Sequence, residues 1–249
     1  MPQPVNHDPS APVDGSRRGW PIAPPWRPRC LACGEPGCGA HDLCAGCRQA
    51  LPWLGHACPA CALPLRTSPC NGPGEDLCGQ CQKLAPPLQR VVAAFLYAAP
   101  VDRWLPRFKF HRDLAAGRLL SQLMLEACAA APRPSALVPI PLHRARLRQR
   151  GYDQALELAR PLARALALPL RGDLLRRRRA TTPQSELHAS ERKRNLRDAF
   201  VANAAVAMPG HVVLVDDVMT TGATLHAAAD ALRRAGAARV DAWVCARVP

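Results

Sequence analysis

From about residue 91 onward, short apolar runs alternate with longer segments whose apolar residues recur every three or four positions. Short apolar, β-branched runs are typical of strands, and the three-to-four spacing is typical of helices that bury one face. The run at 212–215 has valine at three of its four positions, which favours a strand buried on both faces. We therefore expect strands at 91–97, 136–140, 199–201, 212–215 and 239–247, and helices at 102–110, 114–130, 153–166 and 225–235.

Before the break at Pro86 and Pro87, large apolar residues are few and cysteines are dense. Ten of the twelve cysteines lie between residues 30 and 81, and eight of them form four C-x-x-C pairs. Two thiolates at this spacing can bind one tetrahedral Zn²⁺. The gaps of ten and sixteen residues between successive pairs fit two zinc ribbons. The expected zinc ligands are Cys30, Cys33, Cys44, Cys47, Cys58, Cys61, Cys78 and Cys81.

The pairing of these ligands has two solutions. Sequential pairing closes each ribbon locally and is favoured, whereas interleaved pairing would join the first C-x-x-C pair to the third. Cys38, His41, His56 and Cys70 are spare candidates. Because the segment 29–84 has a small apolar core, metal must supply much of its folding free energy, and we expect a structural or partner-binding module.

The formal net charge of +14 implies affinity for anions such as nucleic acid, nucleotides or pyrophosphate. An arginine bias from a GC-rich genome would also explain much of it. No apolar run reaches 18 residues, so we expect no membrane insertion. The first 28 residues contain eight prolines and no signal-peptide core, so we expect a disordered tail. The cysteines then belong in a reducing cytoplasm, which favours metal ligation over disulfides.

Candidate chemistry concentrates in HVVLVDDVMTTGAT, residues 211–224. The free N–H groups and dipole of a helix N-terminus favour an anion, and glycine lets the backbone approach it closely. Asp216 and Asp217 suit the hydroxyls of a sugar, or a shared Mg²⁺. The segment therefore predicts a site for a phosphorylated ribose, although an ordinary turn capped by threonine has the same elements. The candidate phosphate-binding residues are Thr220, Thr221, Gly222, Ala223 and Thr224.

Basic residues follow the expected strand at 136–140. Four arginines alternate with other residues from Arg144 to Arg150, and we expect a loop. At the C-terminal end of a strand such a loop is well placed to hold pyrophosphate, although a solvated basic turn would look the same. Lys109, which lies between Phe108 and Phe110, is a further candidate phosphate contact.

Residues 171–197 carry nine basic and three acidic residues around a polar centre that lacks periodicity. We expect a mobile basic loop between two strands. It could be a catalytic lid, a surface for single-stranded nucleic acid, or a merely solvated loop. The absence of aromatic residues from the loop weakens the nucleic-acid interpretation.

The run VVLVDDVMTTGAT resembles the 5-phosphoribosyl-1-pyrophosphate (PRPP) motif of type I phosphoribosyltransferases. The C-x-x-C pairs, LPRFKFHRD, VPIPLHRARLRQRGYDQA and RRRRATTPQSELHASERKRNL precede it in order. Together they make the chain resemble the ComF family (ComFC/GntX type) over residues 30–247. The resemblance implies an α/β fold at 88–249, type I phosphoribosyltransferase-like, with a mostly parallel sheet flanked by helices. It also implies a small Cys-rich double zinc ribbon before that fold. Family members act in the cytoplasm, in natural transformation and the use of external DNA, on incoming single strands.

By this resemblance, Asp216 and Asp217 are the candidate catalytic residues and bind the ribose hydroxyls, directly or through Mg²⁺. Residues 220–224 would bind the 5-phosphate. Arg148, Arg150 and Gly151 match the family's R-x-R-G segment, and Arg179, Thr182, Gln184, Arg192, Arg194 and Asn195 match its later polar loop. The chain departs from the family pattern at Tyr152-Asp153-Gln154, where F-N-Q is common. Tyrosine in place of phenylalanine is conservative, but aspartate in place of asparagine changes the polar contact at Asp153.

Three functions fit this sequence. The first is a DNA-uptake protein that keeps a PRPP pocket, handles single-stranded DNA and works with helicase or recombination proteins. The second is an active phosphoribosyltransferase with an unidentified acceptor, in which arginines stabilise departing pyrophosphate. The third is a zinc-ribbon adaptor whose pocket only senses a ligand. No base-recognition element stands out, so ordinary nucleobase salvage is the weaker enzymatic alternative.

Overall fold

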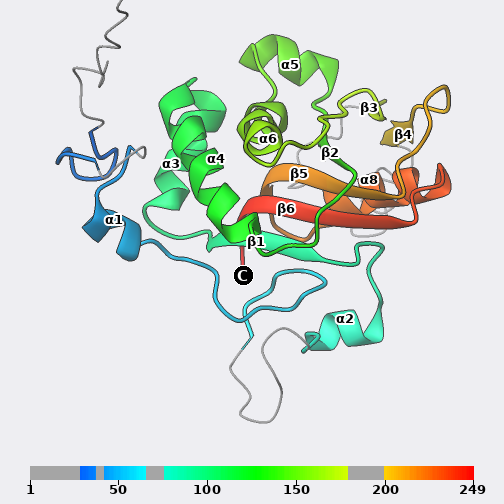
Figure 1. Ribbon diagram of the computed structural model, residues 1–249, viewed down its shortest axis with the longest axis horizontal. Helices are drawn as coiled ribbons and strands as arrows, with labels where there is room; N and C mark the ends of the chain where they lie inside the picture. The colour runs from blue at the N-terminus through cyan, green and yellow to red at the C-terminus, as the bar shows by residue number, and fades with distance from the viewer. Residues whose placement is uncertain (1–28, 38–41, 66–75, 179–198) are drawn as a thin grey trace, which may run out of the picture.

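A parallel sheet forms the centre of the molecule (Figure 1). The computed structural model describes residues 29–37, 42–65, 76–178 and 199–249. Its central sheet has the strand order β1 (Val91–Leu96), β6 (Arg239–Arg247), β5 (His211–Met219) and β2 (Ala136–Pro139), and every neighbouring pair is parallel. A second, antiparallel pair consists of β3 (Leu175–Arg177) and β4 (Phe200–Ala202). The predicted α/β class with a mostly parallel sheet is confirmed.

Helices cover both faces of the central sheet (Figure 1). One face packs against α3 (Val101–Phe110), α4 (Leu114–Cys128) and α6 (Gln154–Ala165), and the other against α8 (Ala223–Arg234) with the β3–β4 pair. Along β5, Val213 and Val215 belong to the first core, whereas Val212 and Leu214 belong to the second. Successive strand side chains point to opposite faces, which is why an uninterrupted apolar run forms a strand between two helical layers.

The strand β5 is longer than the apolar run predicts. It continues through both aspartates to Met219, because Val218 and Met219 remain in register with Ala246 and Arg247 of β6. The two carboxylates are therefore held by the sheet itself rather than by the turn that follows. The other predicted strands and long helices lie within a few residues of their observed bounds.

The arginine segment is a short helix, α5 (Arg144–Arg150), and the prediction of a loop there is wrong. Arg, Leu and Gln are good helix formers, and such residues can form a helix even where the sequence offers no continuous apolar face. His143 caps its start by accepting a hydrogen bond from the Ala145 amide, and Gly151 ends it in the left-handed conformation, at φ +86°. In Figure 1 this helix lies at the top of the molecule, above α6.

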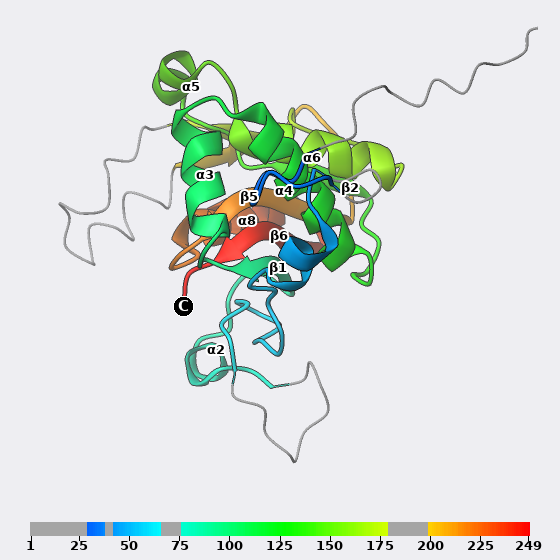
Figure 2. The ribbon, with the colours of Figure 1, turned by 90° about the vertical axis from the view of Figure 1, so that its left-hand side faces the viewer.

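The two Cys-rich segments attach differently to the sheet domain. Near α1 (Ala45–Gln49), Leu43 and Leu51 belong to the same buried core as Phe95 and α4, and Arg48 forms an ion pair with Glu126 of α4. The second segment contains α2 (Gly79–Lys83) and has a small core of its own around Cys58. In Figure 2, α1 lies beside α4, whereas α2 lies farther from the sheet.

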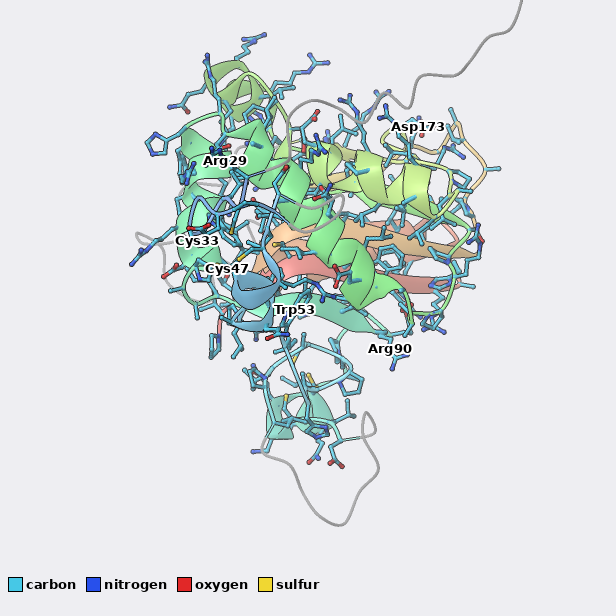
Figure 3. The ribbon with its side chains drawn as sticks, turned by 60° about the vertical axis from the view of Figure 1, so that its left-hand side comes forward. Arg29, Cys33, Cys47, Trp53, Arg90 and Asp173 are labelled. Carbon is cyan, nitrogen blue, oxygen red and sulfur yellow. The ribbon has the colours of Figure 1, made fainter. Side chains whose placement is uncertain are left out.

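The linker between these segments runs along the edge of the sheet. The Leu54 amide donates to the Ala94 carbonyl and the Leu96 amide donates to the Pro52 carbonyl, both at 2.9 Å. Between them the Trp53 ring lies 4.7 Å from the Phe95 ring, centre to centre. Figure 3 shows Trp53 beside β1, with Cys33 and Cys47 nearby. Across the described part of the chain, no helix combines the length and apolar character needed to cross a membrane.

Candidate functional site

Eight cysteines form two groups whose sulfurs all lie within 4.8 Å of one another within each group. The first contains Cys30, Cys33, Cys44 and Cys47, and the second contains Cys58, Cys61, Cys78 and Cys81. This is the sequential pairing. Zn–S bonds of about 2.3 Å in a tetrahedron place sulfurs about 3.8 Å apart. The structure has 3.7 Å between Cys33 and Cys44 and 3.6 Å between Cys61 and Cys78, so both groups fit Zn²⁺.

The spare metal-ligand candidates do not join these groups where the structure describes them. The Nε2 atom of His56 lies 3.8 Å from an Asp76 carboxylate oxygen, outside both cysteine groups. Cys38, His41 and Cys70 lie outside the described residues. Four thiolates fill a tetrahedron, so each group is suited to structural rather than catalytic zinc.

The turn from β5 into α8 forms a concave backbone at a helix N-terminus. Gly222 is the N-cap of α8, with φ +76°, and it offers no capping side chain. The hydroxyl of Thr221, one residue earlier, accepts a hydrogen bond from the Ala223 amide at 3.4 Å. A Cβ atom there would lie 2.5 Å from Met219 Cε and 3.2 Å from His226 Nε2. Glycine is therefore required both by backbone conformation and by space. The N-cap is glycine rather than the threonine considered from the sequence, and the amides that follow Ala223 in the first turn of α8 can bind an anion.

The two aspartates have different environments. Asp217 is 8% exposed and forms an ion pair with Lys109, whose Nζ lies 3.0 Å from its Oδ2. The carboxylate of Asp216 accepts a hydrogen bond from the Asp217 amide. Burial, followed by repulsion from Asp217, raises the pKa of Asp216 to about 8. Asp216 is therefore largely protonated at neutral pH without a ligand, and a bound cation would favour its ionised form.

Basic side chains line the same cavity as this acid pair. The cavity has a volume of about 270 Å³, and we call it the central cavity. Lys109 comes from α3, Arg146 and Arg150 come from α5, and Arg177 comes from β3. Thr220 and Thr224 of the α8 turn lie at its wall. Two carboxyl groups, several cationic side chains and a helix N-terminus suited to phosphate thus line one cavity.

The structure brings together some predicted residues and leaves others apart. Lys109 and Arg150 line the central cavity, Gly151 ends α5, and Arg148 is exposed on α5 away from the lining. Arg146 lies four residues before Arg150 and so shares a helix face with it, whereas Arg148 lies two residues before Arg150 and is on a different face. Arg146 therefore lines the cavity where Arg148 was expected to do so. Predicting α5 as a helix would have identified it.

Two further polar residues at the cavity escaped the sequence analysis as site residues. Gln154 is 2% exposed; its Oε1 accepts from Arg150 at 2.6 Å, and its buried Nε2 has no hydrogen-bond partner in the described residues. Asp153 caps α6 by accepting from the Leu156 amide, and its other oxygen accepts from the Leu142 amide. Burial raises the pKa of Asp153. Asp153, which stands where asparagine is common in the family, thus accepts two backbone hydrogen bonds, and these join α6 to the segment after β2.

The six candidate residues of the predicted mobile basic loop have no described structure. Its residues, Arg179, Thr182, Gln184, Arg192, Arg194 and Asn195, lie outside the described residues. The strands before and after it are described, and the Arg178 amide donates to the Ala199 carbonyl at 2.8 Å. Arg177 lies over the Phe200 ring, 5.3 Å from its centre, and lines the central cavity.

Comparison with known proteins agrees with this architecture. Residues 23–82 match the family model of a double zinc ribbon domain, and residues 153–249 match that of a phosphoribosyl transferase domain. The chain is 36% identical over 225 residues to the DNA utilization protein YhgH of Escherichia coli K12, covering 88% of this chain and 96% of that protein. The chain belongs to the ComF family.

Other ComF relatives extend over a similar length. Competence protein F of Haemophilus influenzae is 33% identical over 231 residues, which cover 88% of this chain and 96% of that protein. Competence protein ComFC of Bacillus subtilis is 30% identical over 217 residues, which cover 83% and 85%. The ComF membership predicted from motif order is confirmed, as are the zinc-ribbon module and the phosphoribosyltransferase-like fold.

Proposed function

We propose that this ComF protein acts in DNA uptake or the use of external DNA, and that its central cavity binds PRPP with Mg²⁺. The observation that carries the ligand assignment is the shared cavity, which Asp216 and Asp217 line together with two threonines of the α8 turn and the cations of α5. A phosphorylated sugar with a pyrophosphate needs these three kinds of group in one site. Neither a nucleobase nor a bare phosphate needs the acid pair.

The described side chains suggest a part for each section of PRPP. The backbone of residues 220–224 would hold the 5-phosphate. Asp216 and Asp217 would accept hydrogen bonds from the ribose hydroxyls, or supply oxygen ligands to Mg²⁺, which would neutralise phosphate charge. Arg146 and Arg150 would hold pyrophosphate, and Gln154 Nε2 would donate to a ligand oxygen.

The names of the relatives support a role in DNA utilisation, which we extend to this chain as a cytoplasmic protein that handles incoming single-stranded DNA. The basic segment 171–197 provides positive charge for such a strand. Helicase or recombination proteins are the partners we expect. Charge reversal at 176–179 should weaken single-strand binding for every sequence tested, and an unchanged affinity at moderate salt would exclude this segment as the DNA site.

An active phosphoribosyltransferase is the second candidate. The intact acid pair and the cations favour it, because positive charge near departing pyrophosphate stabilises the transition state. Release of pyrophosphate from PRPP in the presence of a nucleobase, nucleotide or DNA acceptor would support turnover. Binding of PRPP without release across that panel would support the ligand-sensing role instead.

Calorimetry of the zinc-loaded, full-length protein with PRPP, with and without Mg²⁺, tests the cavity assignment. We expect Mg²⁺-dependent binding that Asp217→Asn weakens at least tenfold. Arg148→Ala is the matched control for Arg146→Ala, because both residues are arginines of α5 and, of these two, Arg146 alone lines the central cavity. Undetectable PRPP binding by the wild-type protein, or equal effects of the two arginine variants, would contradict the assignment.

A further inference from the structure

A second cavity, of about 600 Å³, adjoins the central cavity on the side of α5. We call it the outer cavity. It is lined by Lys109, Phe110, Arg112, Arg146, Gln149 and Arg150, and three of these residues, Lys109, Arg146 and Arg150, line the central cavity too. Four of the six lining residues are cationic and none is acidic. The outer cavity therefore favours an anion, and it lacks the carboxylates that suit a sugar or a metal ion.

An exposed aromatic ring distinguishes the outer cavity from a simple phosphate site. Phe110 ends α3 and is 65% exposed, whereas Phe108, two residues earlier, is completely buried. The Arg150 guanidinium lies over the Phe110 ring, 5.0 Å from its centre. An exposed ring beside guanidinium groups offers a stacking surface to a nucleobase, because every base has a planar π face.

The backbone at Arg112 gives an independent indication. Its φ of +56° is in the left-handed region, which is unfavourable for a residue with a long side chain. The surrounding structure must hold such a residue in place, and residues of this kind cluster at ligand sites. Here the strained turn between α3 and α4 carries the Arg112 guanidinium to the wall of the outer cavity.

We propose that the outer cavity is a nucleotide subsite, in which the base stacks on Phe110 and the Arg112 guanidinium holds the phosphate. This inference rests on the proposed function, because it names the second ligand that binds beside PRPP. A free nucleotide and a nucleotide within a single strand have this chemistry in common. The inference also supplies the aromatic stacking surface that the basic segment 171–197 lacks.

Fluorescence anisotropy and calorimetry with three probes test the subsite in the zinc-loaded, full-length protein. The probes are dTMP, a short oligo(dT), and an oligomer of the same length whose central positions lack bases. We expect Phe110→Ala to weaken binding of the two base-containing probes about tenfold and to leave the abasic oligomer within twofold. Preference for dTMP over the oligomer would assign the subsite to free nucleotides, and the reverse would assign it to single strands.

Matched controls separate stacking and charge from folding. Leu114→Ala removes another exposed apolar side chain, four residues after Phe110, and Arg103→Ala removes an exposed arginine from α3. Arg112→Asn removes the guanidinium but keeps a residue that tolerates the left-handed backbone. We expect weaker nucleotide binding for Arg112→Asn and wild-type binding for both controls. Unchanged nucleotide affinity in Phe110→Ala and Arg112→Asn would overturn the inference.

PRPP titration distinguishes failure of this subsite from failure of the proposed function. We expect the affinity of Phe110→Ala for PRPP with Mg²⁺ to stay within twofold of wild type. An equal loss for PRPP and for nucleotides would mean that the outer cavity is no separate subsite. If the wild-type protein bound nucleotides through Phe110 but not PRPP, the subsite would stand and the PRPP assignment would fall.

Discussion

The two zinc ribbons and the central cavity are stabilised by different interactions. The zinc ribbons contain few large apolar side chains, and the second has a core of little more than Cys58, Ala60, Cys78 and Cys81. In contrast, strands and helices with two extensive cores form the walls of the central cavity. A bound ion must therefore supply much of the folding free energy of the ribbons, whereas packing builds the cavity and holds two carboxyl groups close together there before any ligand arrives. Ligand binding adds folding free energy in the first case and favours ionisation of Asp216 in the second.

Removal of zinc should produce the largest effect, because structural zinc contributes about 10–16 kcal/mol of apparent binding free energy. We expect chelation to unfold the ribbons and to loosen α3 and α4 as well, since Leu43 and Leu51 share their core. Hydrogen exchange should show loss of protection in both regions, with β5 and α8 retained. Zinc content well below two ions per chain in metal-replete protein would contradict the double centre.

Substitution of Gly222 tests the opposite case, a site built by backbone geometry. Gly222→Ala should cost about 1 kcal/mol in the free energy of unfolding, because an L residue is strained at positive φ. It should also remove most PRPP affinity, since the new Cβ would crowd Met219 and His226 beneath the α8 turn. Calorimetry and thermal unfolding measure the two effects.

Gly236→Ala is the matched control, because Gly236 also has a positive φ, +105°, but no atom lies within 4 Å of its added Cβ. It should show a similar loss of stability and normal PRPP binding. If both variants lost PRPP affinity equally, backbone strain alone would account for the result, and the α8 turn would not be the phosphate site.

Neutralising Asp216 should stabilise the ligand-free protein. Its folded-state pKa of about 8 is above the usual 3.8, so its contribution to stability falls as pH rises through that interval, and the loss is fully present above pH 8. Asp216→Asn should therefore raise the free energy of unfolding at pH 8 by about 1–2 kcal/mol and have almost no effect at pH 3.5. Urea unfolding at the two pH values measures this.

Asp217→Asn provides the comparison, because it removes the partner of Lys109. It should lower stability or leave it unchanged at pH 8. A stabilised Asp217→Asn protein, or a destabilised Asp216→Asn protein, would mean that the acid pair does not hold the charge distribution described above.

The smallest effect is expected where the first ribbon meets α4. Arg48 and Glu126 form an ion pair whose Arg48 side chain is 49% exposed. Such pairs contribute about 0–1 kcal/mol. Arg48→Ala should therefore leave thermal unfolding nearly unchanged, and Leu51→Ala should lower it clearly. Equal losses would indicate that charge rather than apolar packing attaches the first ribbon.

Local sequence patterns predicted the parts of the molecule whose chemistry depends on spacing along the chain. The C-x-x-C pairs identified the zinc ligands, and the order strand, Asp216, Asp217, Gly222, helix identified the cavity wall. What escaped prediction depends on helix phase or on distant contacts. Arg146 faces the cavity only because α5 is a helix. Lys109 was a candidate, but its ion pair with Asp217 joins residues far apart in the sequence. The exposed position of Phe110 was likewise invisible, since Phe108 lies in the same apolar context.

The linker through Trp53 has a consequence for the behaviour of the protein in cells. β1 is an outermost strand of the central sheet, and an uncovered outer strand can pair with strands of other molecules. Hydrogen bonds with the Pro52 carbonyl and the Leu54 amide occupy part of this edge, and the linker is held at both ends by zinc-binding segments. Metal supply should therefore govern colloidal behaviour as well as folding. Zinc-starved cells should accumulate this protein as strand-paired aggregates rather than as soluble unfolded chains.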